Sequence, residues 1–432
     1  MLALTYRFLT DLAAPGISLY LLKRRAEGRE DRLRFRERLG FASKPRPEGR
    51  LIWCHAASVG EAASLLTLID KIRETYPDTT VVMTSGTITS ARMLEKRLPS
   101  GTFHQYVPVD RMPYVRRFLK HWQPDLALWV ESELWPNTLA ALRKNHVPAV
   151  LLNGRMSAKS FSNWRRMRGW ARQILSAFDV CLVQSTEARS YYTALGARSV
   201  RLTGNLKYAV KPLPCDPDDL AKLQKDTAGR TLWGMMSTHR GEEIIAANTH
   251  RQLRAKWPDL LTVIVPRHAV RGDEIAQRLT ELGVIFARRS KGDAITPQTE
   301  IYLADTMGEL GLFYRLCSVV VMGGSFVPIG GHNPVEPAQL DASIVFGPSM
   351  FNFSAIAREF VADKAAIQIK NVGELPAVLD RLLGNPIERI NLARAAQQLA
   401  EQKRKVLDEI VDLLRPWLDR GMSASGQGKA RR

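Results

Sequence analysis

The sequence predicts an α/β protein built from two doubly wound domains. Short apolar runs alternate with helical segments between residues 51 and 184, a pattern typical of a parallel sheet with helices on both faces. Around Gly204 the alternation stops, residues 207–217 indicate a linker, and the alternation restarts at Thr231. A chain of 432 residues, 45% of them hydrophobic, is long enough for two such domains.

Each half of the chain contains enough strand-like runs for a complete sheet. Ligands of such sheets bind beyond the carboxyl ends of the strands, so two domains that face each other would form a central cleft. No internal sequence repeat is obvious between the halves. The expected strands are residues 51–56, 79–83, 126–130, 147–153 and 180–184 in the first half, and residues 286, 231–235, 261–265, 301–303, 319–322 and 344–346 in the second.

The alternation and its interruptions predict five parts of the chain. The order is an apolar segment, a first domain, a linker, a second domain and a polar tail that follows a Gly/Ser-rich stretch. The predicted parts are a membrane-associating segment (1–25), a first doubly wound domain (26–209), a linker (210–224), a second doubly wound domain (225–420) and a basic disordered tail (421–432).

The N-terminal segment has the length but not the composition of a membrane span. Residues 2–22 are mostly apolar and about 20 residues suffice to cross a bilayer. Arg7, Asp11 and the pair Pro15-Gly16 are costly or disruptive in mid-membrane, however. The pattern therefore favours a helix that lies in the interface, with the basic residues from Lys23 onward on anionic head groups. The alternative is an amphipathic helix packed on the protein body.

The net charge of +19, with a pI near 10.0, indicates an acidic partner: nucleic acid, an anionic membrane or a polyanionic substrate. Two clusters carry much of this charge, although a solvated helix face is the simpler explanation for either one taken alone. The clusters are Lys23, Arg24, Arg25, Arg29, Arg32, Arg34, Arg36 and Arg38, and Arg165, Arg166 and Arg168 beside Trp164 and Trp170.

The four cysteines favour a reducing compartment. They are scattered through the sequence with no Cys-x-x-Cys spacing, and three of them lie in or beside apolar strand-like runs. Neither a disulfide framework nor a zinc site is indicated.

A glycine-rich turn, residues 323–337, follows the apolar run 317–322. Its two Gly-Gly pairs would let the backbone approach a ligand closely. Asn333-Pro334 marks the start of a following helix, whose N-terminus would attract phosphate, and Glu336 could accept hydrogen bonds from sugar hydroxyls. The pattern suits a nucleotide; the alternative is a glycine loop in an ordinary α/β unit.

Polar residues follow the expected strands in both halves. Each alone could be a helix cap or a surface side chain, because capping residues share this position. Their occurrence after several strands predicts one shared site at the carboxyl ends of the sheets. These residues are Glu61, Glu131, Glu133, Ser237-Thr238-His239, Arg267-His268 and Met307-Gly308-Glu309, together with the glycine-rich turn.

Several of these stretches, in order, closely resemble the Kdo transferase family. Its members transfer 3-deoxy-D-manno-octulosonic acid (Kdo) from CMP-Kdo to lipid A precursor in Gram-negative bacteria. The resemblance extends from the apolar N-terminus to about Trp417 and implies the GT-B arrangement of two Rossmann-like domains. The matching stretches are His55 to Glu61, Glu131 to Pro136, Gly204 to Lys207, Pro266 to His268, Asp305 to Glu309 and Gly330 to Glu336.

The resemblance also implies roles for individual residues. Glu61 matches the general base of an inverting transfer, and Glu131 and Lys207 match residues that stabilise the transition state. Glu133 is expected to support the site rather than take part in the chemistry, and residues 237–239 are expected to add hydrogen-bond donors. The expected CMP-Kdo-binding residues are Arg267, which would meet the phosphate, His268, Met307, Gly308, Glu309, Asn333, Pro334, Val335 and Glu336, which would meet the ribose.

The same resemblance implies the partners and the location. The acceptor would be lipid A precursor (lipid IVA), bound by the first domain at the anionic inner-membrane surface, and the second domain would bind CMP-Kdo on the cytoplasmic side. This is an early step of lipopolysaccharide inner-core assembly. No Asp-x-Asp pair follows a strand, so no metal is expected, and no cofactor and no nucleic acid are needed.

Three alternatives differ in what they require of the sequence. Another GT-B glycosyltransferase would use a different nucleotide sugar. A non-enzymatic protein that binds nucleic acid or membrane is suggested by charge alone and would not need Glu61. A dinucleotide dehydrogenase is disfavoured because no Gly-x-Gly-x-x-Gly motif follows the first strand.

Overall fold

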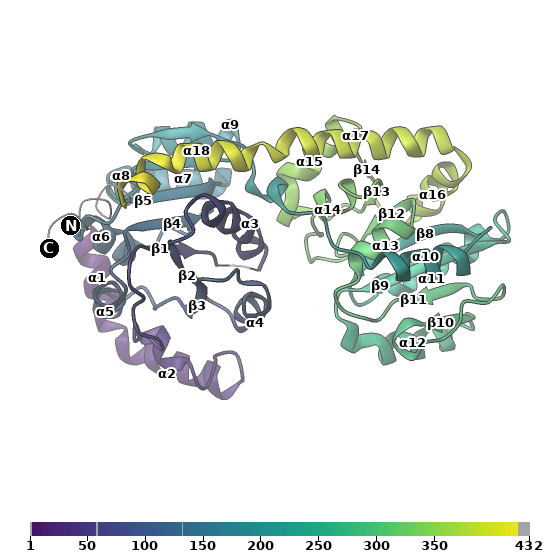
Figure 1. Cartoon of the computed structure of the whole chain (residues 1–432), viewed down its shortest axis with the longest axis horizontal. Coiled ribbons are helices and arrows are strands. Elements are labelled where there is room, and N and C mark those ends of the chain that lie inside the picture. Colours follow the sequence, from purple (N-terminus) through teal and green to yellow (C-terminus); the bar gives the residue numbers. More distant parts are fainter. Residues whose placement is uncertain (1, 58, 132, 422–432) are drawn as a thin grey trace, which may run out of the picture. The chain divides into compact units, whose positions relative to one another are not determined.

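The computed structural model describes residues 2–57, 59–131 and 133–421, which form two compact units, each a parallel sheet with covering helices (Figure 1). Unit 1 comprises the described residues up to Val210 and from Arg404 onward, and unit 2 comprises Lys211–Lys403. The predicted tail falls almost wholly outside the described residues. That the two domains face a common cleft stays a prediction.

The sheet of unit 1 has seven parallel strands in the order β3-β2-β1-β4-β5-β6-β7. The order reverses direction between β1 and β4, and such a switch point is where doubly wound sheets bind ligands. The strands are β1 (Leu51–His55), β2 (Thr80–Ser85), β3 (Thr102–Tyr106), β4 (Leu126–Val130), β5 (Ala149–Gly154), β6 (Val180–Val183) and β7 (Val200–Leu202).

The central strands of unit 1 are apolar throughout because helices cover both faces of the sheet. Alternate side chains of β1 enter opposite cores: Trp53 packs with Trp129 on one face, and Ile52 lies in the core of the other. The helices are α1 (Leu2–Leu12), α2 (Ala14–Ala26), α3 (Val59–Thr75), α4 (Ile88–Arg97), α5 (Met112–Trp122), α6 (Pro136–Lys144), α7 (Ala158–Arg166), α8 (Arg168–Leu175), α9 (Thr186–Ala194) and α18 (Val406–Leu418), with 3₁₀ turns η1 (Phe35–Leu39), η2 (Leu206–Ala209) and η7 (Asp419–Gly421).

The sheet of unit 2 also has seven parallel strands, in the order β10-β11-β9-β8-β12-β13-β14. Its switch point lies between β8 and β12. The strands are β8 (Thr231–Thr238), β9 (Leu260–Pro266), β10 (Phe286–Arg288), β11 (Ile301–Leu303), β12 (Val319–Met322), β13 (Ser343–Phe346) and β14 (Ile367–Gln368). The helices are α10 (Pro217–Asp226), α11 (Glu242–Arg254), α12 (Gly272–Glu281), α13 (Leu310–Leu316), α14 (Val335–Ala338), α15 (Ser354–Ala362), α16 (Leu375–Gly384) and α17 (Pro386–Arg404), with 3₁₀ turns η3 (Ala269–Arg271), η4 (Arg289–Lys291), η5 (Phe351–Phe353) and η6 (Val372–Glu374).

Two predicted boundaries are corrected by this division. The second domain does not continue to residue 420, because α18 belongs to unit 1, where Ile410, Leu414 and Leu418 are fully buried in the core against α3. Their spacing of four residues gives the helix one apolar face. The predicted linker, 210–224, is shorter than expected, because α10 already begins at Pro217.

The N-terminal segment forms two helices, α1 and α2, rather than one. Ala13 separates them and Pro15 lies in the first turn of α2, a position that proline tolerates. Within the part of the chain that the structure describes, no helix is long and apolar enough to cross a membrane. Helix α1 packs against α6, and the Tyr6 hydroxyl donates to Asp110 at 3.1 Å. Membrane association therefore stays a prediction.

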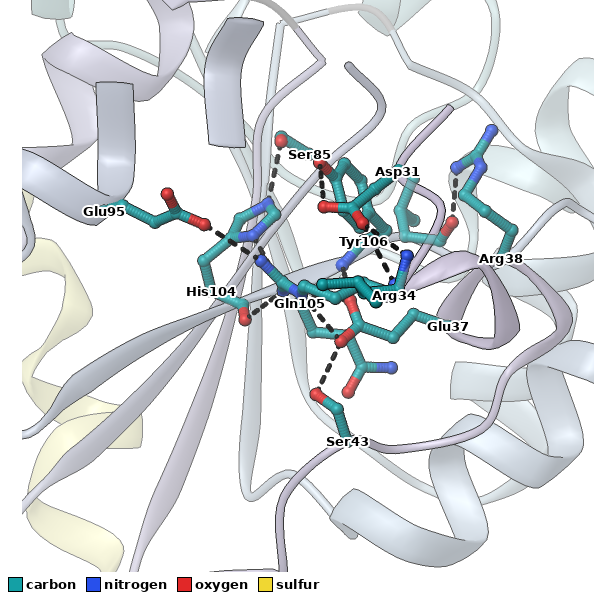
Figure 2. A network of polar contacts seen from close by, with 12 residues as sticks. Asp31, Arg34, Glu37, Arg38, Ser43, Ser85, Glu95, His104, Gln105 and Tyr106 are labelled. Carbon is teal, nitrogen blue, oxygen red and sulfur yellow. Dashed lines mark hydrogen bonds and ion pairs between the residues drawn. The ribbon is translucent and has the colours of Figure 1, made fainter. Parts of the chain in front are cut away.

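Several arginines of the predicted basic stretch, residues 23–38, form ion pairs with buried carboxylates of unit 1; those of Arg34 are drawn in Figure 2. Arg34 donates to both oxygens of the buried Glu37 at 2.9 Å and to the backbone oxygen of His104 at 2.7 Å. Glu37 also accepts the backbone N–H of Tyr106 at 2.6 Å, which ties the stretch to β3. Arg24, like Arg38, pairs with the buried Glu30. The remaining exposed cations of the stretch are Lys23, Arg29, Arg32 and Arg36.

Candidate functional site

Glu61 lies just beyond the carboxyl end of β1, at the switch point of unit 1. It occupies the first turn of α3, and its side chain is 8% exposed. One carboxylate oxygen accepts the backbone N–H of Ala57 at 2.9 Å. The helix dipole favours a negative charge at this position, which suits a carboxylate that must accept a proton. Ser58, from the same motif, lies outside the described residues.

Strand β1, which precedes Glu61 in the chain, ends in His55, a buried and neutral histidine. His55 packs against Trp129 and Trp135 with tilted rings, whose centroids are 4.3 Å and 5.0 Å away, and its Nδ1 lies 3.0 Å from the Thr84 hydroxyl. Burial lowers the pKa of His55 to about 3. This histidine joins the ends of β1, β2 and β4 and so supports the loop that carries Glu61.

Glu131 follows β4, the other strand at the switch point. Its side chain is almost fully buried between two cations: Arg155 Nε lies 2.6 Å from one carboxylate oxygen, and Lys207 Nζ lies 3.1 Å from the other. The second contact is an ion pair without the geometry of a directed hydrogen bond. Glu131 has a positive φ of 59°, an uncommon conformation for a glutamate. Such strain is typical of functional positions.

Two asparagines hold the turn that carries Lys207. The side-chain oxygen of Asn205 accepts the backbone N–H of Lys207, and that of Asn153 accepts the backbone N–H of Leu206, both at 3.0 Å. The predicted pair Glu131 and Lys207 is thus brought together. The sequence analysis missed Arg155, although its place directly after β5 is the same strand-end signal that identified Glu131.

Glu133 lies in the turn that follows β4, and its supporting role stays a prediction. Its carboxylate accepts the indole N–H of Trp135 at 2.7 Å, and its backbone oxygen accepts the indole N–H of Trp129. These bonds shape the turn between β4 and α6. Ser132, between the two glutamates, lies outside the described residues.

In unit 2, Arg267 and His268 follow β9 and are exposed. The backbone N–H of Arg267 donates to Thr238 at 3.0 Å, which places both residues beside the end of β8. Among the described residues Arg267 has no ion-pair partner. A guanidinium in this situation is available for an anionic ligand.

Two histidines lie against each other beside Arg267. The Nε2 atoms of His239 and His332 are 3.0 Å apart and their rings are stacked. Burial, followed by the charge of Arg267, lowers the pKa of His332 to about 3, and burial also lowers the pKa values of His239 and His268. Neutral imidazoles can both donate and accept hydrogen bonds, and Arg267 then supplies the positive charge.

The glycine-rich turn is held by a buried carboxylate that the sequence analysis missed. Glu242 accepts the backbone N–H groups of Gly324, Phe326 and His239 at 2.7, 3.1 and 2.8 Å. Gly323 lies so close to β8 that an added Cβ would be 2.4 Å from the Ser237 oxygen, so only glycine fits there. In the sequence, Glu242 looks like an ordinary first-turn acid of α11.

Asn333, Pro334, Val335 and Glu336 form the end of this turn and the start of α14. The side-chain oxygen of Asn333 accepts the backbone N–H of Val335 at 3.2 Å. Helix α14 is a single turn with Glu336 half-buried at its start. Burial raises the pKa of the Tyr314 hydroxyl; the charge of Glu336 raises it further, and the charge of Arg267 opposes this. Arg267 and Glu336 therefore lie near the same phenol.

Met307, Gly308 and Glu309 form an exposed loop after β11. Met307 is 72% exposed, and Gly308 has a φ of +91°, which favours glycine. Both oxygens of Glu309 accept from Arg289, at 2.7 and 2.6 Å, and this pairing lowers the pKa of the carboxyl. Its side chain thus fixes the loop, and contact with the donor by any of these three residues stays a prediction.

Within the described ranges, no group of three His, Cys, Asp or Glu side chains is placed to hold a metal ion. The side chains available for chemistry lie at the carboxyl ends of two parallel sheets. They are the carboxylates of Glu61, Glu131 and Glu336, the cations Arg155, Lys207 and Arg267, and the neutral histidines His239 and His332.

Comparison with known proteins identifies the family. The family described as 3-deoxy-D-manno-octulosonic-acid transferase (kdotransferase) matches residues 33–210. The 3-deoxy-D-manno-octulosonic acid transferase of Rickettsia bellii is 34% identical over 411 residues, which cover 95% of this chain and 98% of the relative. The chain belongs to the Kdo transferase family. It is therefore a glycosyltransferase that transfers Kdo in lipopolysaccharide biosynthesis, and the non-enzymatic and dehydrogenase alternatives are wrong.

Solved structures show the same architecture. HepE of Anabaena, solved in complex with UDP, is 16% identical, covers 85% of this Kdo transferase chain and is itself covered completely, with a TM-score of 0.56. Two parallel-sheet α/β domains resembling GT-B glycosyltransferases are thus confirmed. A structure of the C-terminal CMP-Kdo binding domain of WaaA from Acinetobacter baumannii is 35% identical, covers 44% of this chain and is itself covered over 96% of its length, with a TM-score of 0.38.

Proposed function

We propose that this Kdo transferase transfers Kdo from CMP-Kdo to lipid A precursor (lipid IVA) with inversion, and that Glu61 is the general base. The observation that carries the proposal is the Glu61 carboxylate at the switch point of unit 1, held by the Ala57 N–H at a helix N-terminus. It accepts the proton of the acceptor hydroxyl as that oxygen bonds to the anomeric carbon of Kdo. The bond from this carbon to the phosphate oxygen breaks, and CMP leaves with the electron pair.

The ion-paired cluster in unit 1 supports this transfer electrostatically. Glu131 lies between two cations, Arg155 and Lys207, and so places positive and negative groups side by side. We assign Lys207 to the negative charge of the Kdo carboxylate or the departing CMP, and Glu131 to the oxocarbenium-like centre. Fixed charges aimed at charge that develops in the transition state are typically the largest catalytic contribution.

Unit 2 is proposed to bind the CMP moiety. Arg267, which has no ion-pair partner in the described part of the chain, would bind the phosphate, and the backbone N–H groups of the glycine-rich turn would add donors. Glu336 would accept from the ribose hydroxyls. Because CMP leaves as an anion that a fixed cation such as Arg267 can stabilise, we propose that no metal and no cofactor take part.

The N-terminal helices are proposed to hold the enzyme at the cytoplasmic side of the inner membrane. Leu4, Phe8 and Leu12 are each more than half exposed and lie four residues apart on α1. Leu19 is similarly exposed on α2, which ends in basic residues. An exposed apolar stripe next to cations is typical of an interfacial helix.

A transfer assay with lipid A precursor and freshly generated CMP-Kdo, read by mass, tests this function. The wild-type enzyme should add one or more Kdo units. Glu61→Ala should add none while it still binds CMP, and Glu187→Gln, a first-turn carboxylate of α9, should behave as wild type. Arg267→Gln should instead weaken CMP binding about tenfold or more. Equal activity of Glu61→Ala and wild type would refute the base assignment.

A further inference from the structure

A cavity in unit 1 is not used by the proposed transfer. It has a volume of about 320 Å³ and lies between α1, α6 and α8. This is the size of a small-molecule binding site. The polar and aromatic residues that line it are Arg7, Asn137, Arg143, Lys144, Trp170 and Gln173.

The lining is positively charged without compensation. Arg7, Arg143 and Lys144 contribute three cations, and no carboxylate occurs among the described residues that line the cavity. The neighbouring Asp110 does not line the cavity; its carboxyl group accepts from the backbone N–H and the hydroxyl of Thr138, both at 2.7 Å, and from Tyr6. Because charges in a concave, partly dry site are weakly screened, the cavity favours an anion.

The donors that line the cavity favour a ligand with oxygen acceptors. Arg7, Arg143 and Lys144 contribute guanidinium and ammonium groups, and Asn137 and Gln173 contribute side-chain amides. Phosphate oxygens are the best match for an arginine fork beside a lysine.

The surroundings of the cavity favour a phosphate that is carried by a lipid. Leu4, which is 67% exposed, lies one helical turn before Arg7, and it begins the apolar stripe that continues through Phe8 and Leu12. One helix therefore presents a cation to the cavity and apolar side chains to the solvent. A free phosphate would use only the first of these features, whereas a lipid would use both.

We propose that this cavity binds the phosphate group of an anionic lipid, at a site separate from Glu61, Glu131 and Lys207. The inference does not rest on the proposed donor, acceptor or general base, because it concerns binding alone. Of the predicted cluster around Trp164, only Trp170 lines the cavity; Arg165, Arg166 and Arg168 do not.

The test measures binding of the full chain to dihexanoyl phosphatidylglycerol by calorimetry. Arg143→Gln/Lys144→Gln should weaken binding about tenfold or more, because two charge-assisted contacts are lost. Arg92→Gln/Lys120→Gln removes the same charge from exposed positions of α4 and α5 and should change the affinity less than twofold. Equal weakening by the two pairs would overturn the proposal in favour of non-specific charge attraction.

Two further arms identify the occupant. Inorganic phosphate and glycerol phosphate should bind much more weakly than the short-chain lipid; equal affinity would overturn the assignment to a lipid. Wild type should bind phosphatidylcholine vesicles that contain phosphatidylglycerol more tightly than Arg143→Gln/Lys144→Gln does. The two proteins should bind equally to vesicles without phosphatidylglycerol. Identical binding of both proteins to the anionic vesicles would also overturn the proposal.

Discussion

Lys207 Nζ lies 3.1 Å from a carboxylate oxygen of Glu131, so the turn η2 contacts the residue that follows β4. Because Glu131 is almost fully buried between Arg155 and Lys207, removal of either member of the Glu131–Lys207 pair changes the charge balance of this cluster. We expect Lys207→Met and Glu131→Gln each to lower kcat by about 10²-fold, the range typical of lost transition-state stabilisation. The measurement is single-turnover kinetics with lipid A precursor.

The double variant distinguishes a coupled pair from two independent groups. Lys207→Met/Glu131→Gln should lose less activity than the product of the single effects, because the contact is lost only once. Strict multiplicativity would contradict a shared role. Lys159→Met, which removes an exposed lysine from α7, is the matched control and should retain wild-type kcat.

The sequence predicted the central strands of both sheets but missed three edge strands. β3, β7 and β14 were not expected, and each lies at an edge of its sheet. An edge strand has one neighbour and is less buried, so its sequence need not be an apolar run. β7 is the clearest case, since two of its three residues are exposed. Apolar runs therefore identify the strands that are buried on both faces but miss the edge strands other than β10.

The sequence predicted the site residues that directly follow strands. It did not predict those whose role arises from contacts with distant parts of the chain. Glu61, Glu131 and Arg267 follow strands, and the topology brings the carboxyl ends of those strands to one edge of each sheet. Glu242 gives no such signal, because its role arises from three backbone groups, two of which belong to a loop more than eighty residues later in the chain. Arg155 does follow a strand, β5, but only the tertiary structure shows that it contacts Glu131.

Glu242 is expected to determine the order of the glycine-rich turn. Glu242→Ala leaves three backbone N–H groups without their acceptor, at a cost of about 1–3 kcal/mol for each buried group. We expect the thermal midpoint to fall and amide exchange at Gly324 and Phe326 to accelerate, with weaker CMP binding as a consequence. Glu281→Gln, an exposed change in α12, should alter stability by less than about 0.5 kcal/mol. Unchanged exchange at Gly324 would refute the role.

Helix α18 is expected to be part of the folding unit of the first domain. Ile410 is fully buried in the core of unit 1, so Ile410→Ala should cost about 2–5 kcal/mol through lost burial and the cavity left behind. Ile387→Ala, at a position of α17 that is 73% exposed, makes the same chemical change and should cost little. Urea unfolding measures both. Similar costs would indicate that α18 packs only loosely on unit 1.

Stability should fall as the pH is lowered from 7 towards 4, because buried histidines must remain neutral. His104 shows why (Figure 2): Arg34 can only donate to its Nδ1, at 3.0 Å, and its Nε2 lies 2.9 Å from the Ser85 hydroxyl, which suits a neutral ring that donates to Ser85. Burial, helped by the charge of Arg34, lowers the pKa of His104 to about 3, and burial lowers those of His55 and His332 to about 3 as well.

The unfolded chain titrates its histidines near pH 6.5, so below that pH it binds more protons than the native state and unfolding is favoured. Each of these histidines should cost about 2 kcal/mol at pH 5 relative to pH 7. His104→Gln should therefore reduce the pH dependence of the urea midpoint by one such contribution. Ser85→Ala is the control, because it removes the hydrogen bond at every pH but keeps the titrating group, so it should lower the midpoint without a change of slope. An identical slope in His104→Gln and wild type would show that His104 accepts a proton without loss of the native structure.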